Sequence, residues 1–277
     1  MRILTFILLC GLIVLPPDCV SQQKKDHHKG HLIIIGGGKR PPSIMEKFVE
    51  LSGGSEARIA IIPTASSYYL EVGKEYEQEF LNLGAARAQA SYIRSREEAD
   101  QDSIIERLKT FSGYFFGGGD QNRLTEYFLE SKALQLFHDQ YQKGAIFGGT
   151  SAGAAIMSSI MITGEGNWEI PMRDSVVARP GFGFISNAII DQHFFKRRRF
   201  NRLLNTVIQH QTNGIGIDES TAIWVKPDDE IEVLGASVVI VLQTSRAGFE
   251  EPDSSGLLTT RGIELSVYKK NDRFRLE

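Results

Sequence analysis

The sequence predicts an α/β fold in which a mostly parallel sheet is covered by helices on both faces. Short apolar runs alternate with longer helical stretches from residue 31 to the middle of the chain. Such runs are almost continuously apolar, as in residues 32–35, because helices cover a parallel sheet on both sides. The chain has 277 residues and 42% apolar content, which is enough for one substantial core. We therefore expect residues 31–277 to form a single α/β domain.

Each predicted element follows from its local pattern. β-branched and aromatic runs that end in glycine, proline or small polar residues predict strands at 31–35, 57–62, 87–93, 113–116 and 145–147. Periodic apolar residues between these runs predict helices at 41–51, 69–83 and 97–110, and two amphipathic helices before residue 145. A further strand ends at Gln192, and a long helix that carries His210 follows it. The last third adds extra strands, expected at 215–217, 221–225, 231–234, 237–242 and 263–268.

Residues 1–21 have the pattern of a secretory signal peptide. A positively charged start precedes an apolar run at residues 3–15, which is too short to span a membrane. Small residues at the expected positions favour cleavage after Ser21, and lipidation of Cys19 is the weaker alternative. The polar residues 22–30 are typical of a tether. We therefore expect a secreted or periplasmic protein with no stable membrane span.

Composition excludes several classes of site. The cysteines Cys10 and Cys19 both lie in the leader, so the mature chain would have no disulfide, thiolate nucleophile or cysteine metal site. The net charge of −3 does not favour nucleic acid, but residues 196–199 with Arg202 form a basic cluster suited to an anionic ligand group. The glycines at 36–38 do not complete a dinucleotide fingerprint, so we expect a turn facing the site, and neither cofactor nor metal.

The most informative motif in the chain is a glycine-flanked serine. Gly149, Ser151 and Gly153 have the spacing of a nucleophile elbow, between an apolar strand and a helix. A serine at the tip of such a turn is strained, and a Cβ two residues away, at the position of either glycine, would crowd it. The turn exposes Oγ and leaves the amide of Ala152 able to stabilise an oxyanion. The alternative is an ordinary glycine-rich turn of an α/β domain.

A serine nucleophile needs a base and usually a carboxylate that orients the base. His193 lies at the carboxyl end of an apolar strand, at the sheet edge where Ser151 is also expected. His138 fits a solvated surface helix, and His210 lies near a helix C-terminus, where the helix dipole favours it. Three acidic residues at strand ends remain open as the partner: Asp191, Asp218 and Glu219. A carboxylate partner would raise the pKa of the histidine above about 6.5.

Four motifs follow one another along residues 30–277. They are FFGGGDQNRL at 115–124, GTSAGA at 149–154, DQHF at 191–194 with Arg197, Arg199 and Arg202 after it, and GIDE at 216–219. Together they resemble the motifs of the cyanophycinases, which are serine peptidases of the aspartyl-dipeptidase group with a class I glutamine-amidotransferase-like fold. The resemblance implies that Ser151 is the nucleophile, His193 the general base and Glu219 the orienting acid.

The resemblance also implies a substrate. Cyanophycin has a poly-aspartate backbone with arginine on each β-carboxyl, and the family cuts the backbone to release β-Asp-Arg dipeptides. The matching pocket positions are Gln121, Asp191, Gln192, Arg197, Arg199 and Arg202. Arginines can hold substrate carboxylates bidentately, and Asp191 can pair with a substrate guanidinium. Gly118, Gly119 and Ala152 are expected to form the oxyanion site. The oligomeric state stays open, with a homodimer as the candidate assembly.

The predicted export leaves two other functions to consider, because cyanophycin is stored inside cells. The first is an exported dipeptidase for Asp-X or isoaspartyl peptides. The second is a non-catalytic binding protein, although none of Ser151, His193 and Glu219 is replaced. An esterase of the α/β-hydrolase type would place the acid before the histidine, which is the reverse of the order implied here.

Overall fold

A computed structural model describes residues 30–277 of the chain. The predicted signal peptide at 1–21 and all but the last residue of the predicted tether at 22–30 lie outside the described residues. None of the helices in residues 30–277 has the length and apolar content needed to cross a membrane.

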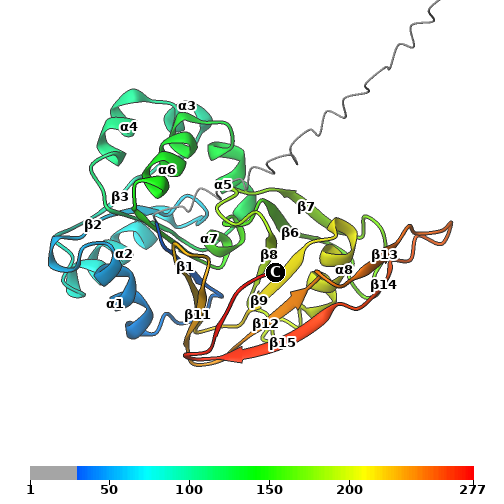
Figure 1. Ribbon diagram of the computed structural model, residues 1–277. Helices are drawn as coiled ribbons and strands as arrows, with labels where there is room; N and C mark the ends of the chain where they lie inside the picture. The colour runs from blue at the N-terminus through cyan, green and yellow to red at the C-terminus, as the bar shows by residue number, and fades with distance from the viewer. Residues whose placement is uncertain (1–29) are drawn as a thin grey trace, which may run out of the picture.

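The larger of two main sheets has eight strands, in the order β16-β11-β10-β1-β5-β4-β2-β3 (Figure 1). Its parallel part consists of β1 (Leu32–Ile35), β5 (Ile146–Thr150), β4 (Gly113–Phe116), β2 (Arg58–Ile62) and β3 (Arg87–Ala90). Antiparallel pairing then extends it with β10 (Thr221–Val225), β11 (Ile231–Gly235) and β16 (Arg273–Phe274). The fold is therefore α/β with extra C-terminal strands, as the sequence predicts.

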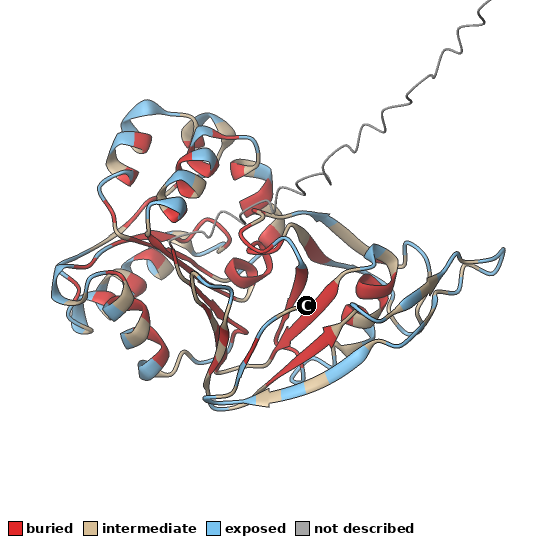
Figure 2. Ribbon diagram, in the orientation of Figure 1, coloured by how far each residue is buried: buried red, intermediate tan, exposed pale blue. Residues whose placement is uncertain are grey.

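Helices pack on both faces of the parallel part. Side chains of β1 alternate between the faces, so that Leu32 and Ile34 belong to one apolar cluster and Ile33 and Ile35 to another. One face is covered by α1 (Pro42–Leu51) and α2 (Tyr69–Asn82). The other is covered by α4 (Asp102–Leu108), α5 (Gln121–Phe128) and α6 (Lys132–Gln142). Figure 2 shows buried strands between helices whose outer faces are exposed.

The second sheet has four strands, in the order β15-β12-β9-β8. They are β8 (Ala188–Gln192), β9 (Asn213–Ile217), β12 (Val238–Gln243) and β15 (Glu264–Lys269). One face of this sheet shares the larger apolar cluster with the main sheet, and α8 (Phe200–His210) packs on the other face. Two hairpins flank these strands: β6 (Ile160–Gly166) with β7 (Val176–Pro180), and β13 (Gly248–Glu250) with β14 (Thr259–Arg261).

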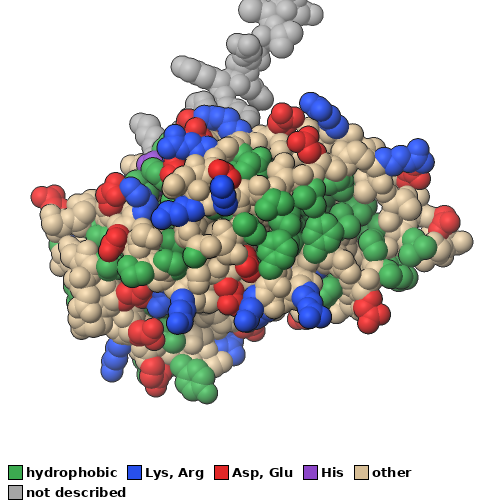
Figure 3. Space-filling view, turned by 90° about the horizontal axis from the view of Figure 1, so that it is seen from below, with side chains coloured by type: hydrophobic (Ala, Val, Ile, Leu, Met, Phe, Trp, Pro, Cys, Tyr) green, Lys and Arg blue, Asp and Glu red, His purple; other side chains and the backbone are tan. Residues whose placement is uncertain are grey.

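Strand β15 is an edge strand with apolar side chains in contact with solvent. Leu265 and Val267 are 49% and 55% exposed. Figure 3 views the molecule from the side on which β15 lies, and apolar side chains gather over part of that face.

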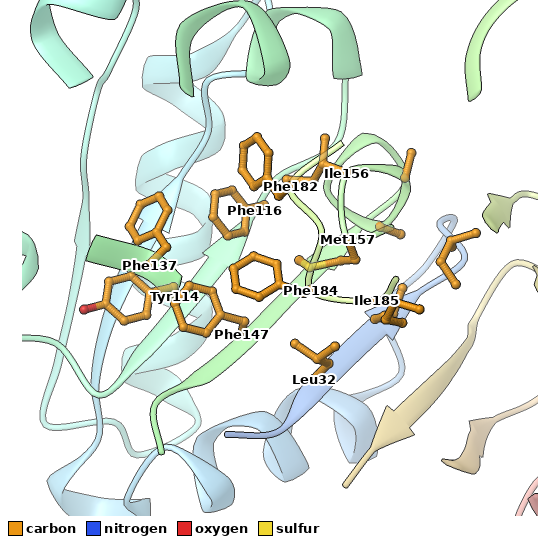
Figure 4. Packing of buried hydrophobic residues seen from close by; sticks show 14 of the residues in the cluster. Leu32, Tyr114, Phe116, Phe137, Phe147, Ile156, Met157, Phe182, Phe184 and Ile185 are labelled. Atoms are coloured by element: carbon orange, nitrogen blue, oxygen red, sulfur yellow. The ribbon is translucent and has the colours of Figure 1, made fainter. Parts of the chain in front are cut away.

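The aromatic residues of the shared cluster form its densest part. The ring of Phe147 on β5 stacks on Tyr114, with centroids 4.6 Å apart, and Phe184 packs 4.8 Å from Phe147. Figure 4 shows these rings facing Phe116, Phe137 and Phe182. Strand β5, which leads to Ser151, is thereby held in the centre of the core.

The structure differs from the predicted elements at several points. The helix predicted at 97–110 consists of α3 (Arg96–Ala99) and α4, because the chain turns at Asp100 and Gln101. The helix predicted after Ser151 has only four residues, in α7 (Ala152–Ala155). Both flanking hairpins, η1 (Gly54–Glu56) and β16 were not predicted.

Candidate active site

Ser151 occupies the tip of a sharp turn between β5 and α7. Its backbone has φ 54° and ψ −109°, a conformation that non-glycine residues rarely adopt. Its amide donates to Ile35 O on the neighbouring strand β1, at 3.1 Å. The predicted strained serine at a turn between strand and helix is therefore present, and such strain is typical of functional sites.

The glycines on either side of the serine are required by close backbone approach. A Cβ on Gly149 would lie 2.4 Å from the carbonyl oxygen of Gly153. A Cβ on Gly153 would lie 2.2 Å from the carbonyl oxygen of Phe116 on β4. Any larger residue would force the turn away from the sheet, because real Cβ atoms do not approach backbone so closely.

His193 follows β8 and brings its ring to the serine. Its Nε2 lies 2.9 Å from Ser151 Oγ. Its backbone is also strained, with φ 51°, and its amide donates to Gly36 O at 2.6 Å. The main sheet therefore positions Ser151, through β5, and the second sheet positions His193, through β8.

Glu219 lies between β9 and β10, and its Oε1 is 2.7 Å from Nδ1 of His193. With Nδ1–H donating to this carboxylate, Nε2 remains an acceptor for the Ser151 hydroxyl. The neighbouring Asp218 has a different place, since its carboxylate accepts from the amides of Phe195 and Lys196 and from Ser237. The geometry thus separates Glu219 from Asp218, two of the three acids that the sequence alone left open.

The glycine-rich loop after β1 covers this contact. A Cβ on Gly37 would lie 2.3 Å from Cε1 of His193, and a Cβ on Gly38 would lie 2.8 Å from Cβ of Glu219. Both glycines have positive φ, at 106° and 70°. The loop faces the site, as expected, and its lack of side chains lets the backbone press on the imidazole and the carboxylate.

Burial lowers the pKa of His193, which corrects the expectation of a raised pKa. Desolvation is the largest cause, and the guanidinium groups of Arg197 and Arg199 act in the same direction. The hydrogen bond to Glu219 opposes these effects without cancelling them. The imidazole therefore stays neutral, and able to accept a proton, at lower pH than an ordinary histidine.

A cleft of about 340 Å³ opens over Ser151. Its floor and walls come from the ends of β1, β4, β5 and β8 and from α2. The lining residues are Gly38, Arg40, Val72, Glu75, Tyr76, Gly118, Thr150, Ser151, His193 and Arg197. Of the residues predicted from the sequence, four line this cleft: Gly118, Ser151, His193 and Arg197.

The other predicted oxyanion residues lie close by in the chain. Gly119 packs on the 63–66 turn, where its Cβ would lie 2.1 Å from Ala65 O, and Ala152 is fully buried directly after Ser151. A Cβ on Gly118 would lie 3.4 Å from Cβ of Ser151, so this loop borders the serine.

The remaining predicted pocket residues form a network behind the cleft. Arg202 donates from both Nε and Nη2 to Asp191, and both residues are at most 1% exposed. Arg199 donates to Gln192 O at 2.7 Å and lies 3.6 Å from Asp191. Burial, with Arg202 nearby, lowers the pKa of Arg199 to about 10. Asp191 is thus paired with Arg202 and, contrary to what the sequence suggested, is not open to a substrate guanidinium in the cleft.

Gln121 does not line the cleft. Its Nε2 donates to Ile162 O at 2.9 Å and to Thr163 O at 2.6 Å, and it is 8% exposed. It therefore anchors strand β6 near the buried Arg202, because both side chains lie close to Gly164.

Four other residues line the cleft and were not predicted from the sequence: Arg40, Val72, Glu75 and Tyr76. Arg40 follows the glycine loop that was expected to face the site, which was a usable signal. Glu75 and Tyr76 lie inside the predicted helix 69–83, where nothing local distinguishes them from other helix residues.

The two other histidines considered as bases lie elsewhere. His138 is half-buried and packs 4.9 Å from the ring of Phe184, so it is not the fully solvated residue that was expected. His210 is exposed at the end of α8, as expected. Within residues 30–277 no three His, Asp or Glu side chains gather as a metal site would require.

Comparison with known proteins gives a consistent result. The family model of peptidase family S51 matches residues 32–234. A cyanophycinase of Trichormus variabilis is 36% identical over 238 residues, which cover 84% of this chain and 80% of that protein. A cyanophycinase of Geminocystis herdmanii is 34% identical over 241 residues, covering 83% and 87%.

Solved structures agree in fold. A peptidase from an acI-B1 Actinobacterium superposes with a TM-score of 0.70 at 22% identity, covering 91% of this chain and 98% of that one. A putative peptidase E from Listeria monocytogenes EGD-e superposes with a TM-score of 0.53 at 17% identity, covering 75% and 99%.

Proposed function

Because the chain belongs to peptidase family S51, we propose that it is an exported cyanophycinase that uses Ser151, His193 and Glu219 to cut the backbone of cyanophycin. The observation that carries this proposal is the continuous contact from Ser151 Oγ through His193 to Glu219, at 2.9 and 2.7 Å. The similarity to cyanophycinases over more than four fifths of the chain supports the substrate. The apolar run at residues 3–15 supports export.

The proposed reaction begins with attack by Ser151 Oγ on the scissile carbonyl carbon. Nε2 of His193 takes the hydroxyl proton as the bond forms, and the carboxylate of Glu219 stabilises the imidazolium that results. The developing oxyanion accepts hydrogen bonds from backbone amides at Gly118, Gly119 and Ala152. His193 then gives the proton to the leaving amine as the C–N bond breaks. Water, which passes a proton to His193, attacks the acyl carbon, and this proton returns to Ser151 Oγ as the ester bond breaks and the acid product leaves.

Charge in the cleft supports an ionic substrate. Arg197 is exposed at the cleft wall and can hold a carboxylate of the substrate by two parallel hydrogen bonds. The buried Arg202–Asp191 pair and Arg199 then act as positioning residues, because they fix the segment that follows His193. A narrower dipeptidase for Asp-X or isoaspartyl peptides is the second candidate, favoured by the predicted export.

Incubation of the protein with purified insoluble cyanophycin, followed by mass spectrometry of the soluble products, tests this proposal. We expect β-Asp-Arg dipeptides from the wild-type protein and none from Ser151→Ala. Hydrolysis of Asp-Leu or isoaspartyl dipeptides without release from the polymer would favour the second candidate. Loss of residues 1–21 from protein recovered outside the cells would support export.

A further inference from the structure

One wall of the cleft is formed by α2, which presents a carboxylate to the same cleft as Ser151. Glu75 lines the cleft together with Ser151 and His193, and its side chain is 69% exposed. Among residues 30–277 that line the cleft, it is the only carboxylate. Its position one turn before Glu79 on the helix places both acids beside Arg40.

Arg40 is already neutralised by the other acid. Its Nη2 lies 2.8 Å from Glu79 and its Nε lies 3.3 Å from the same carboxylate, and its guanidinium sits 4.5 Å from the centre of the Tyr76 ring. The contact from Arg40 to Glu75 is longer, at 3.4 Å, and reaches only one oxygen. Glu79 therefore holds Arg40, while most of the acceptor capacity of Glu75 stays open to the cleft.

The acid that the sequence suggested for a substrate cation is not open in this way. Asp191 is 0% exposed, and both of its carboxylate oxygens accept from Arg202. Breaking such a buried pair is costly, since it leaves a charge unpaired in the interior. A cation that enters the cleft meets Glu75 instead, and a substrate carboxylate meets Arg197.

We propose that Glu75 is a specificity-determining residue that binds the guanidinium of an arginine side chain on the peptide held at Ser151. This inference rests on the proposed function and names one side-chain subsite of it. A guanidinium binds a carboxylate through two parallel hydrogen bonds that its positive charge strengthens. A neutral urea of similar shape lacks this charge. The peptide also covers the exposed carboxylate when it binds, which reduces solvent screening of the pair.

A pair of matched peptides isolates this contact. One is a short synthetic peptide of β-Asp-Arg units, and the other carries citrulline in place of each arginine. We expect kcat/KM of the wild-type protein to be about fivefold to thirtyfold higher for the arginine peptide than for the citrulline peptide. This range lies between the effect expected of an exposed ion pair and that expected of a charged hydrogen bond. In Glu75→Gln this preference is expected to disappear through loss of activity on the arginine peptide alone.

The matched control is Glu46→Gln, which removes an equal charge from the exposed side of α1, outside the cleft. It is expected to keep the wild-type preference. A wild-type preference in Glu75→Gln, with an unchanged melting temperature, overturns the inference and leaves the peptidase function standing. Equal loss of activity on both peptides also overturns it, since that result indicates a structural role.

Binding provides a readout that does not depend on cleavage. Titration calorimetry of both peptides with Ser151→Ala, and with Ser151→Ala combined with Glu75→Gln, is expected to show the same Glu75-dependent preference. If the wild-type protein cleaves neither peptide, the proposed substrate is wrong, and a Glu75-dependent preference in binding still supports the subsite. Equal binding of both peptides to Ser151→Ala overturns it.

Discussion

Ser151 combines a strained backbone with a hydroxyl that contacts a neutral imidazole. Replacing it by alanine removes the proposed nucleophile and keeps both glycines of the turn, Gly149 and Gly153. We expect Ser151→Ala to lose about 10⁴- to 10⁶-fold in kcat, the range seen when a serine of a catalytic triad is removed. Steady-state kinetics with circular dichroism checks this, and more than a tenth of the wild-type kcat in a folded variant would contradict it.

We expect His193, as the proposed general base, to determine how activity depends on pH. Its protonated form cannot accept the Ser151 proton, so activity is expected to fall as pH drops through its pKa. Because burial and Arg197 lower that pKa, the acid limb of kcat/KM is expected to have its midpoint below about 6.5. Arg197→Gln is expected to move the midpoint upward, since a cation that disfavours the imidazolium is removed. An unchanged midpoint in this variant would show that Arg197 does not act on His193.

The arginines that follow His193 are not equivalent. Arg202 is buried against Asp191, so Arg202→Met removes both of its hydrogen bonds to this buried carboxylate and leaves Arg199, at 3.6 Å, as the remaining cation; we expect a cost of about 3 to 5 kcal/mol and about 6 to 20 °C in Tm. Arg197 is exposed, so Arg197→Met is expected to leave Tm nearly unchanged and to raise KM. Differential scanning fluorimetry of the two variants tests the distinction. Similar Tm values with similar increases in KM would mean that Arg202 contacts the substrate directly.

At the scale of the elements, the loop after β1 sets the position of the imidazole. A Cβ at Gly37 would overlap the His193 ring, so Gly37→Ala is expected to displace the base and to reduce kcat/KM by about 10²-fold. Gly84→Ala is the matched control, because Gly84 also has positive φ, at 91°, and nothing lies within 4 Å of its added Cβ. Both variants carry backbone strain, and only Gly37→Ala should lose activity. Equal kinetics in the two variants would separate the loop from the site.

Most strands and helices could be predicted from the sequence, because their apolar periodicity is local. Ser131 and Asp120 cap α6 and α5 with their side chains, which is also a local signal. The hairpins β6–β7 and β13–β14 were not predicted because their sequences lack a strand pattern. Neither β13 nor β14 has a buried residue, and β6 ends in three exposed residues, two of them glycine. The break between α3 and α4 was not predicted, because the residues around Asp100 are polar and compatible with a continuous helix.

The candidate site was partly predictable for the same reasons. Ser151 and His193 stand at strand ends, where sequence places side chains at one edge of a sheet. The choice between Asp218 and Glu219 depends on which carboxylate reaches the imidazole, which is a tertiary fact. The pairing of Asp191 with Arg202 and the place of Glu75 in the cleft also come from contacts between distant segments.

At the scale of the whole molecule, the site joins two sheets that share one core. Phe147 is fully buried between Tyr114 and Phe184 on the strand that leads to Ser151. We expect Phe147→Ala to cost about 3 to 5 kcal/mol and to lower Tm by about 6 to 20 °C, from lost burial and the cavity left behind. Leu81→Ala, at a side chain that is 44% exposed, is the control and should change Tm little. A similar Tm in both variants would contradict this account of the core.

Labelling with a fluorophosphonate tests whether Ser151 is a nucleophile activated by His193. Peptide mass spectrometry of the labelled protein locates the adduct. We expect one adduct, on Ser151, with a rate that falls sharply in His193→Ala because the hydroxyl loses its base. An adduct on another serine, or labelling of His193→Ala at the wild-type rate, would contradict it.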